Sequence, residues 1–575
     1  MMLCRNRLLV IWLCLFSATV TTIARLLNAT DIAFDFPSQI QAAQHLLAGK
    51  GLSIYAWAVE GDLAGRARLL TMAHFPAGYS LCAAALMAMG FSVAAIVKTC
   101  GSVATILGWW AWAELGFCFV GEGLKRSMFW RLVGYAIGFA LPLMCTPPWQ
   151  GTEIFLWAAI PWVVRWEMKG ANGTSSSPRT VSITGVLCGF TILMNYAAVF
   201  LALYAVVMIL VHSKTSSRTL GSRTGWFALG VLPFVGVQIY INHFLSETES
   251  VAGSITLAGG IPVVIQRLWE GLNLLSSANV AIAWWMPRPL LKCLTLPNNL
   301  LLAAATLGGF ALLPKLIASK LGYRSLLSGA GDLRLVATGF FAILPFCLWA
   351  WTGISDYLFV TDSKYYIPLL PLGIFIGYAF AVPSHEQETN SSKLLHRIGE
   401  AYSIGFVLIT ARWLLLLLVP GPISAEKHAR LMGTTHFNHW PSMKLTYEFS
   451  AARAYALEQI KHKPDTVVVT NHEEWFYGEP SVDGSRITRL KDFRATYING
   501  PARVLIVAED FSGGPPEAVS WWTHYGKLMR ADFFKEVPNL RLLEKFPDEN
   551  VKVLEAWIPA GEHVPLPHNV RVIKG

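Results

Sequence analysis

Residues 31–51 read DIAFDFPSQIQAAQHLLAGKG and come soon after an apolar run at residues 8–22. Two carboxylates, Asp31 and Asp35, therefore stand where the chain would leave a membrane, and a small amphipathic helix is expected to start near Pro37. Acidic residues at the mouth of a membrane helix bundle usually have a function. This stretch predicts chemistry at a membrane face rather than transport through the membrane.

The composition around this stretch is that of a membrane protein with a soluble part attached. Of the 575 residues, 54% are hydrophobic and only 14% are charged, whereas soluble domains carry about 25% charged residues. Residues 425–575 hold 19 basic and 19 acidic side chains, so the net charge of +10 belongs to residues 1–424. We interpret that charge as a signal of membrane orientation and expect no nucleic-acid partner.

The apolar runs predict a polytopic α-helical membrane domain. A span needs about 20 apolar residues, and eleven runs are candidates. They lie at residues 8–22, 95–120, 128–146, 152–166, 181–196, 197–213, 225–244, 293–313, 335–353, 365–383 and 402–420. The first run follows Arg5 and Arg7 and is interpreted as an uncleaved anchor rather than a signal peptide. Residues 77–90 are too short for a span and predict a re-entrant or interfacial helix.

The basic residues predict the orientation of these spans, because loops on the cytoplasmic side are enriched in Lys and Arg. With the N-terminus inside, the predicted inside loops carry Lys125, Arg126, Arg131, Arg165, Lys169, Arg179, Lys214, Arg218, Arg223, Lys315, Lys320, Arg324, Arg334, Lys393 and Arg397. Eleven spans then place residues 425–575 outside. The first outer loop covers residues 26–76 and belongs to the membrane domain, residues 1–424.

Residues 425–575 alternate between helical and strand patterns, which predicts a small α/β sandwich. The helical patterns cover Tyr447–His462 and Pro516–Met529. The strand patterns cover Thr466–Thr470, Arg503–Ala508, Leu540–Lys545 and Val551–Trp557. No glycine-rich phosphate loop is present in this part of the sequence.

Neither cysteine nor histidine spacing predicts a metal site. All nine cysteines lie in or beside apolar runs and are expected to be buried small hydrophobic residues. The histidines have no tight set of acidic or sulfur neighbours in the sequence. We expect no cofactor, and the sequence does not decide whether a divalent metal ion is needed.

Four motifs in residues 1–420 occur in an order that resembles the GT-C superfamily of membrane glycosyltransferases. The nearest resemblance is to the family 39-like group of protein O-mannosyltransferases and aminoarabinose transferases. The motifs are Asp35 followed by Ala43, Leu46, Leu47 and Gly49; His74-Phe-Pro-Ala-Gly-Tyr79; the segment CTPPWQGTE that ends at Glu153; and Asp362-Ser-Lys364-Tyr365-Tyr366 with Pro371.

The resemblance implies that a sugar is transferred from a polyprenyl-phosphate carrier and that an Asp acts as general base. An acceptor hydroxyl or amine loses a proton as it attacks the anomeric carbon, and a nearby carboxylate can take that proton. Asp35 is the first candidate, and Asp31 and Glu153 are the others. The carrier phosphate needs cations near the outer surface. The candidates for this role are Arg66, Arg68, Arg288 and Lys364, with Tyr365 beside the last.

Each candidate also has a simpler structural interpretation. Asp31 and Asp35 fit a helix N-cap, and Glu153 fits the favourable dipole at a helix start. Lys364 fits an interfacial anchor, and Arg66 and Arg68 fit solvated residues. Two further charges, Glu114 and Arg412, lie within apolar runs, where a charge costs about 2.5–3.5 kcal/mol. They would pair with each other or line a lipid groove.

The favoured function is a glycosyltransferase of an envelope membrane, with the bacterial inner membrane as its expected location. Its partners would be a polyprenyl-phosphate sugar donor, membrane lipid and an acceptor that is a protein, a lipid or a glycan. A transporter or flippase is the first alternative, although no internal repeat with paired broken helices is evident. The second alternative is a non-catalytic envelope assembly protein.

Overall fold

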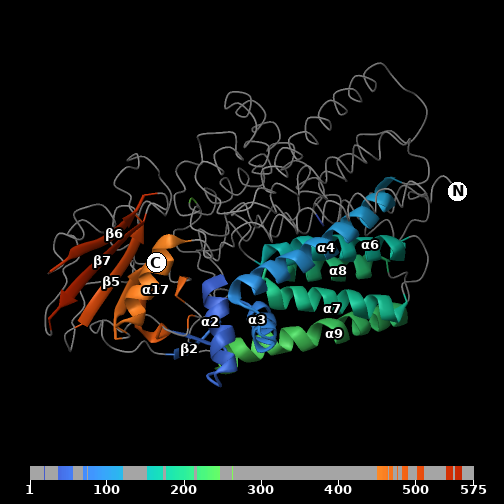
Figure 1. The fold of residues 1–575 in the computed structure, drawn as a ribbon. Coiled ribbons are helices and arrows are strands. Elements are labelled where there is room, and N and C mark those ends of the chain that lie inside the picture. Colours follow the sequence, from blue (N-terminus) through green and yellow to red (C-terminus); the bar gives the residue numbers. More distant parts are fainter. Residues whose placement is uncertain are drawn as a thin grey trace, which may run out of the picture.

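The computed structural model describes a helical part and a smaller part that contains a sheet (Figure 1). The described residues are 19, 36–55, 69–73, 75–120, 152–171, 177–212, 217–245, 262, 450–463, 465–470, 475–476, 479, 482–489, 502–509, 539–547 and 551–559. The predicted spans at 8–22, 128–146 and 293–420, the helix at 516–529 and the boundary at 424 lie outside these residues, so they stay predictions.

The described residues of the helical part include five long helices, which lie side by side in Figure 1. They are α4 (Val93–Val120), α6 (Glu153–Ala171), α7 (Pro178–Met194), α8 (Ala198–His212) and α9 (Ser217–Tyr240), which continues as the π-helix η2 (Ile241–Leu245). Four of them start within three residues of a predicted span, whereas α9 starts at Ser217, eight residues before the predicted start at residue 225. The end of α6 is later than expected, at Ala171 rather than residue 166.

Two of these helices are long and apolar enough to cross a membrane by length and composition: the stretches Val93–Trp112 and Leu220–Leu245. The apolar stretches in α7 and α8, Pro178–Met194 and Ala198–Leu210, are shorter than the usual span. Large apolar side chains are nevertheless exposed on the outside of the bundle. Leu229 and Leu232 of α9 are 63% and 60% exposed, which suits contact with lipid better than contact with water.

Contacts between side chains fix the directions of these helices. Trp109 of α4 packs on Trp157 of α6 with ring centroids 5.8 Å apart. Further along both helices, Arg165 Nη2 lies 2.7 Å from Glu114 Oε2. Residue numbers rise together on the two helices, so α4 and α6 are parallel.

Close contacts of two α7 glycines with α9 show that α7 and α9 are also parallel. A Cβ atom built on Gly185 would lie 2.3 Å from the carbonyl oxygen of Phe227. One built on Gly189, a turn later, would lie 2.8 Å from the Phe234 ring. Both helices therefore run in the same direction, and only glycine permits this close approach of their backbones.

Four arginines of the described helices gather at one end of the bundle, whereas Lys98 lies near the start of α4 at the other end. Arg165 stands in the second half of α6, Arg179 in the first turn of α7, and Arg218 and Arg223 in the first two turns of α9. The alternation of helix directions brings these segments to the same end. The predicted loop assignment is wrong for five basic residues that lie within helices: Arg165, Lys169, Arg179, Arg218 and Arg223. Arg165 also binds Glu114.

The opposite end of the bundle carries the described parts of the first loop. Helix α2 (Phe36–Leu47) begins directly after Asp35, and a hairpin follows, formed by β1 (Ser53–Tyr55) and β2 (Leu69–Thr71). The short helix α3 (Gly78–Ala88) has the length expected of a re-entrant or interfacial segment. The hairpin was not predicted, since three-residue strands leave too little alternation to detect.

The C-terminal part is a mixed five-stranded sheet in the order β4-β3-β5-β7-β6. Its strands are β3 (Val467–Thr470), β4 (Ile487–Arg489), β5 (Ala502–Glu509), β6 (Arg541–Phe546) and β7 (Val551–Ile558). Strands β3, β4 and β5 are parallel, whereas β7 is antiparallel to β5 and β6. Four strands match predicted ones, and the three-residue β4 was missed.

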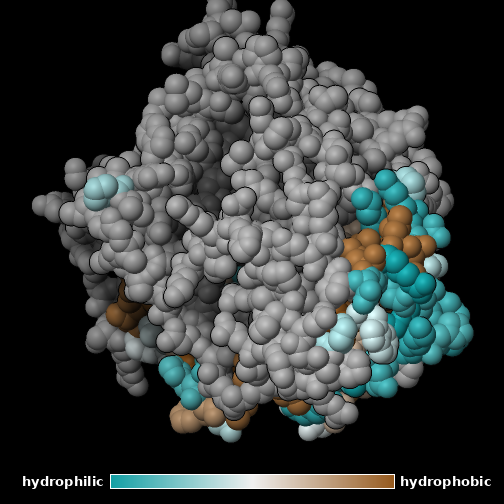
Figure 2. All heavy atoms as spheres, turned by 90° about the vertical axis from the view of Figure 1, so that its left-hand side faces the viewer, coloured by the Kyte–Doolittle hydropathy of each residue, from teal (hydrophilic) through white to brown (hydrophobic). Residues whose placement is uncertain are grey.

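Helix α17 (Ala451–Lys461) covers one face of this sheet. Ser450 caps its start, because its hydroxyl oxygen accepts a hydrogen bond from the Arg453 amide at 3.0 Å. Ala452, Ala456 and Ile460 are spaced for one helix face, and all three are buried in the core shared with the sheet. Seen from the sheet end, the coloured surface is largely hydrophilic on one side, where it surrounds a hydrophobic area, and smaller hydrophobic areas show elsewhere along the edge (Figure 2).

Candidate functional site

The starts of α2 and α6 meet on a single aromatic residue, Tyr79. The Phe36 ring lies 4.8 Å from the Tyr79 ring, and the Phe155 ring lies 6.3 Å from it on another side (centroid distances). Phe36 follows Asp35, and Phe155 is two residues after Glu153. Three of the four sequence motifs thus supply neighbouring residues at one end of the bundle.

Glu153 is the predicted site residue that the structure describes. It is the first residue of α6 and is 2% exposed, so its carboxylate stands within the favourable field of the helix N-terminus. The residue before it is fixed by the turn between α7 and α8. The Asn195 Nδ2 group donates to Thr152 Oγ1 at 3.1 Å, and Asn195 Oδ1 accepts from the Ala197 amide at 2.9 Å.

The other predicted site residues lie outside the described part of the chain. These are Asp31, Asp35, Arg66, Arg68, Arg288, Lys364 and Tyr365. Asp35 immediately precedes α2, and Arg68 immediately precedes β2. Their assignments as base and as phosphate ligands stay predictions.

A polar network holds the segment that leads into Tyr79. The Tyr196 hydroxyl donates to the Ala73 carbonyl at 3.0 Å, and Gln238 Oε1 accepts from the Ala77 amide at 2.9 Å. Gln238 Nε2 donates to Tyr196 Oη at 3.0 Å and to Asn242 Oδ1 at 2.8 Å. The first two bonds tie Ala73 to the α7–α8 turn and Ala77 to α9, so the start of α3 is fixed from two sides.

Sequence reasoning missed this network. Gln238 and Asn242 are polar residues inside an apolar run, which is a visible signal, but the partner of each is far away in the sequence. Asn242 also lies in a π-helical turn, a feature that often marks functional sites. The sequence alone gives no sign of that turn.

Helix α2 is buried on all sides over its first two turns. From Phe36 to Ala43, every side chain whose burial is described is buried, including the polar residues Gln39 and Gln41. Gln41 Oε1 accepts from the Tyr55 amide at 3.1 Å. Polar residues lie on several sides of these two turns, and all of them are buried. Other parts of the protein must therefore cover α2 on more than one side.

His45 links the end of α2 to the hairpin. Its Nδ1 lies 2.7 Å from the Ser53 carbonyl oxygen, which can only accept, so Nδ1 carries the proton. The imidazole also packs edge-on against Tyr55 at 4.6 Å. Burial lowers the pKa of His45 below its ordinary value of 6.5; the bond to Ser53 opposes this shift, and Lys50 adds to it. His45 is therefore a neutral structural residue at pH 7.

The C-terminal part covers α2 from the side away from the bundle. One continuous hydrophobic core contains Phe36 and Ile40 of α2 together with Ala452 of α17 and Trp475. Gly484 comes so close that a Cβ atom there would lie 3.0 Å from the Tyr55 ring and 3.7 Å from Gln41 Nε2. The first loop is thus enclosed between the bundle and the C-terminal part.

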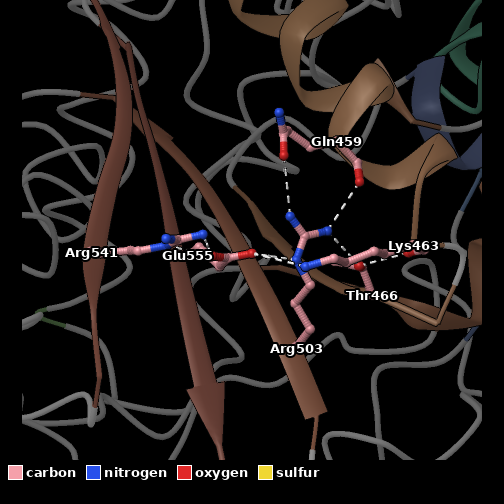
Figure 3. Close-up of polar contacts among 6 residues, drawn as sticks. All are labelled: Gln459, Lys463, Thr466, Arg503, Arg541 and Glu555. Atoms are coloured by element: carbon pink, nitrogen blue, oxygen red, sulfur yellow. Dashed lines mark hydrogen bonds and ion pairs between the residues drawn. The ribbon is translucent and has the colours of Figure 1, made fainter.

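An ionic cluster around the buried residues Arg503 and Glu555 fixes the C-terminal sheet to α17 (Figure 3). Arg503 Nε donates to Glu555 Oε1 at 2.5 Å, and Arg541 Nε donates to Glu555 Oε2 at 2.6 Å. Arg503 also donates to the Gln459 carbonyl near the end of α17 at 3.0 Å and to Thr466 Oγ1 at 2.9 Å. All these groups are matched within the protein, so we assign the cluster a structural role.

Glu555 makes the stability of this part depend on pH. Burial alone would raise the pKa of its carboxyl group, but the hydrogen bonds and charges of Arg503 and Arg541 outweigh burial and hold the pKa below the ordinary value of 4.5. A carboxyl with a depressed pKa stabilises the fold above its unfolded-state pKa and loses that effect as pH falls through the folded-state value.

We expect thermal stability to be insensitive to this group from pH 7 to pH 5 and to fall below about pH 4.5. The Glu555→Gln variant should melt at a lower temperature at pH 7 and show a flatter decline below pH 4.5. Thermal melting of the full-length protein, monitored by tryptophan fluorescence across this pH range, measures both effects. Identical pH profiles for the variant and the wild type would contradict the assignment.

Among the residues that the structure describes, no three His, Cys, Asp or Glu side chains group together to hold a metal ion. The cysteines Cys82, Cys100 and Cys188 are free thiols.

No protein-family model matches the chain, and no curated protein sequence matches it. Two solved structures are similar. One is ArnT from Cupriavidus metallidurans in the apo state, with 13% identity, a TM-score of 0.44, and coverage of 95% of this chain and 97% of ArnT. The other is the archaeal oligosaccharyltransferase AglB from Archaeoglobus fulgidus, in complex with an inhibitory peptide and a dolichol-phosphate. It has 10% identity, a TM-score of 0.36, and coverage of 98% of this chain and 75% of AglB.

Both similar proteins are GT-C glycosyltransferases, the superfamily that the sequence motifs resemble.

Proposed function

We propose that the protein is a membrane glycosyltransferase of GT-C type. It moves a sugar from a polyprenyl-phosphate donor to an acceptor on the outer face of the membrane. The observation that carries this proposal is the contact of Phe36 and Phe155 with Tyr79. Segments beside two motif acids, far apart in the sequence, are adjacent in space at one end of an apolar bundle.

In the proposed reaction, an acceptor hydroxyl or amine attacks the anomeric carbon and gives its proton to Asp35. The carbon–oxygen bond to the carrier phosphate breaks, and the phosphate leaves with the bonding pair. A single displacement of this kind inverts the anomeric configuration. Asp31 and Glu153 are the alternative bases. Lys364 with Tyr365, and Arg66, Arg68 or Arg288, neutralise the leaving phosphate, since charge-assisted bonds suit phosphate oxygens.

Two features support the placement in a membrane: the apolar sides of the bundle and the difference in charge between its two ends. Exposed leucines such as Leu229 and Leu232 cover the sides, and arginines gather at the end away from Tyr79. Basic residues mark the cytoplasmic side. The Tyr79 end, with the first loop and the C-terminal part, then faces outward, as in a bacterial inner membrane with a cytoplasmic N-terminus.

The direct test is transfer by the full-length protein reconstituted in liposomes with a polyprenyl-phosphate sugar and candidate protein, lipid or glycan acceptors. Formation of glycosylated acceptor with release of polyprenyl phosphate supports the proposal. Movement of the lipid-linked sugar across the bilayer without transfer would instead favour a flippase. Neither activity, combined with specific binding of an envelope protein, would favour an assembly role.

The orientation can be tested by cysteine labelling. In a background without the native cysteines, we expect Ser481→Cys to react with an impermeant thiol reagent in intact cells and Ser392→Cys to react only after lysis. The physical reason is that residue 481 belongs to the outward C-terminal part and residue 392 to a predicted inside loop. Labelling of the Ser392→Cys variant alone in intact cells would reverse the orientation.

A further inference from the structure

The hydroxyl group of Tyr79 has no hydrogen-bond partner among the residues that the structure describes, although the side chain is only 1% exposed. An unpaired buried hydroxyl destabilises a protein by about 1–3 kcal/mol. A buried serine can bond a carbonyl of its own helix, but a phenol oxygen lies too far from its own backbone for that. The group therefore needs a partner from elsewhere.

A comparison with Tyr196 makes the contrast clear. The hydroxyl of Tyr196 donates to the Ala73 carbonyl at 3.0 Å and accepts from Gln238 at 3.0 Å. The Tyr196 hydroxyl is thus fully engaged in hydrogen bonds within the protein. Tyr79, only a few residues beyond Ala73, is held by apolar packing that includes the rings of Phe36 and Phe155, and its oxygen has no hydrogen bond among the described residues.

The position of Tyr79 is nevertheless fixed. The Ala77 amide is bonded to Gln238 at 2.9 Å, and a Cβ atom on Gly78 would lie 2.5 Å from the Leu193 carbonyl oxygen. The backbone on its N-terminal side therefore cannot shift without breaking packing against α7 and α9. A fixed side chain whose polar atom the protein does not use is typical of a preorganised ligand contact.

The surroundings of Tyr79 identify the kind of ligand. Helix α3 carries no charged residue, and its sequence GYSLCAAALMA is apolar after the first turn. The ring stands at the starts of α2 and α6, and α6 begins with the candidate acid Glu153. The ligand must reach an apolar helix from the membrane and must bring strong acceptor oxygens to the Tyr79 hydroxyl. The phosphosugar headgroup of a lipid meets both requirements.

We propose that Tyr79 is a donor-binding residue whose hydroxyl donates a hydrogen bond to an oxygen of the phosphosugar headgroup of the lipid-linked donor. The proposal rests on the glycosyltransferase function above and adds a contact that none of the sequence motifs assigned. Loss of a hydrogen bond to a charged group typically costs about 1.5–3 kcal/mol, which corresponds to roughly tenfold to a hundredfold in affinity.

The decisive variant is Tyr79→Phe, which removes one oxygen and keeps the ring. We expect the apparent KM for the lipid donor to rise about tenfold to a hundredfold, while the KM for the acceptor stays within about twofold. The melting temperature should stay the same or increase, because no bond within the protein is lost. Tyr196→Phe should instead lower the melting temperature, since its hydroxyl is bonded. Tyr240→Phe, the same change on the exposed surface of α9, should alter neither value.

A binding measurement separates this inference from the proposed function. Undecaprenyl phosphate in detergent is titrated against the full-length wild type and against Tyr79→Phe, with the melting temperature as readout. Stabilisation of the wild type that needs about tenfold more lipid in the variant supports the inference. Equal stabilisation of both overturns the role of Tyr79 alone. If the lipid does not stabilise the wild type, the proposed polyprenyl-phosphate donor is wrong, and so is the inference about Tyr79. A rise in the acceptor KM without a rise in the donor KM also overturns the inference.

Discussion

Replacing Asp35 by Asn is expected to reduce sugar transfer about 10²–10⁴-fold, the usual contribution of a general base. The amide has nearly the same size and can still accept a hydrogen bond, but it cannot take the proton of the attacking hydroxyl. Expression and thermal melting should stay near wild type, because an N-cap role tolerates Asn as well as Asp. The measurement is the initial rate of transfer in liposomes at saturating donor.

The control for this prediction is Glu153→Gln, made in the same background. Glu153 is buried at the start of α6, and its change should affect melting as well as rate, since a helix N-terminus favours a negative charge. If Asp35→Asn turns over normally while Glu153→Gln is inactive but stable, Glu153 is the base. Normal rates for both variants would leave Asp31 as the remaining candidate.

Replacing Arg165 by Met is expected to produce the largest loss of stability, about 3–5 kcal/mol, because it leaves a buried carboxylate without its ionic partner. Glu114 and Arg165 lie 2.7 Å apart between α4 and α6, and both side chains are largely buried. The guanidinium also stands over the Trp162 ring at 5.7 Å, so packing is lost together with charge. Chemical denaturation in detergent, followed by tryptophan fluorescence, measures the change.

The double variant Glu114→Gln/Arg165→Met should recover part of that loss, because it removes the charge that the single variant leaves behind. Arg223→Met serves as the matched control: Arg223 is on α9 at the same end of the bundle, and it should change stability by less than about 1 kcal/mol. A single Arg165→Met variant as stable as the control would show that the ion pair contributes nothing.

The sequence predicted the elements better than the contacts between them. Helices such as α4 and α7 were predictable because a long apolar run has few other stable forms, and α3 because its run is too short for a span. Strands β5 and β7 were predictable from their apolar content. The hairpin β1–β2 and strand β4 were not, since three residues carry no usable period.

The partners of polar residues were the hardest to predict. Glu114 was expected to pair with Arg412 or to line a groove; the structure shows an ion pair with Arg165, and Arg412 lies outside the described residues. Its charge in an apolar run shows that a partner must exist, but only the parallel packing of α4 and α6 decides which one. The partners of Tyr196 and Gln238 were equally hard to predict. Their bonds to Ala73 and Ala77 form only because the α7–α8 turn and the end of α9 pack beside the start of α3.

The enclosure of α2 has a consequence for the order in which the molecule is made. Helix α2 leaves the ribosome long before Ala452 and Trp475, which cover its side away from the bundle. Twelve residues are too few for a stable helix in water, so until the C-terminal part is made α2 depends on its packing against the bundle alone. A protein cut short before the C-terminal sheet would therefore keep the contact of Phe36 with Tyr79 and expose the other side of α2.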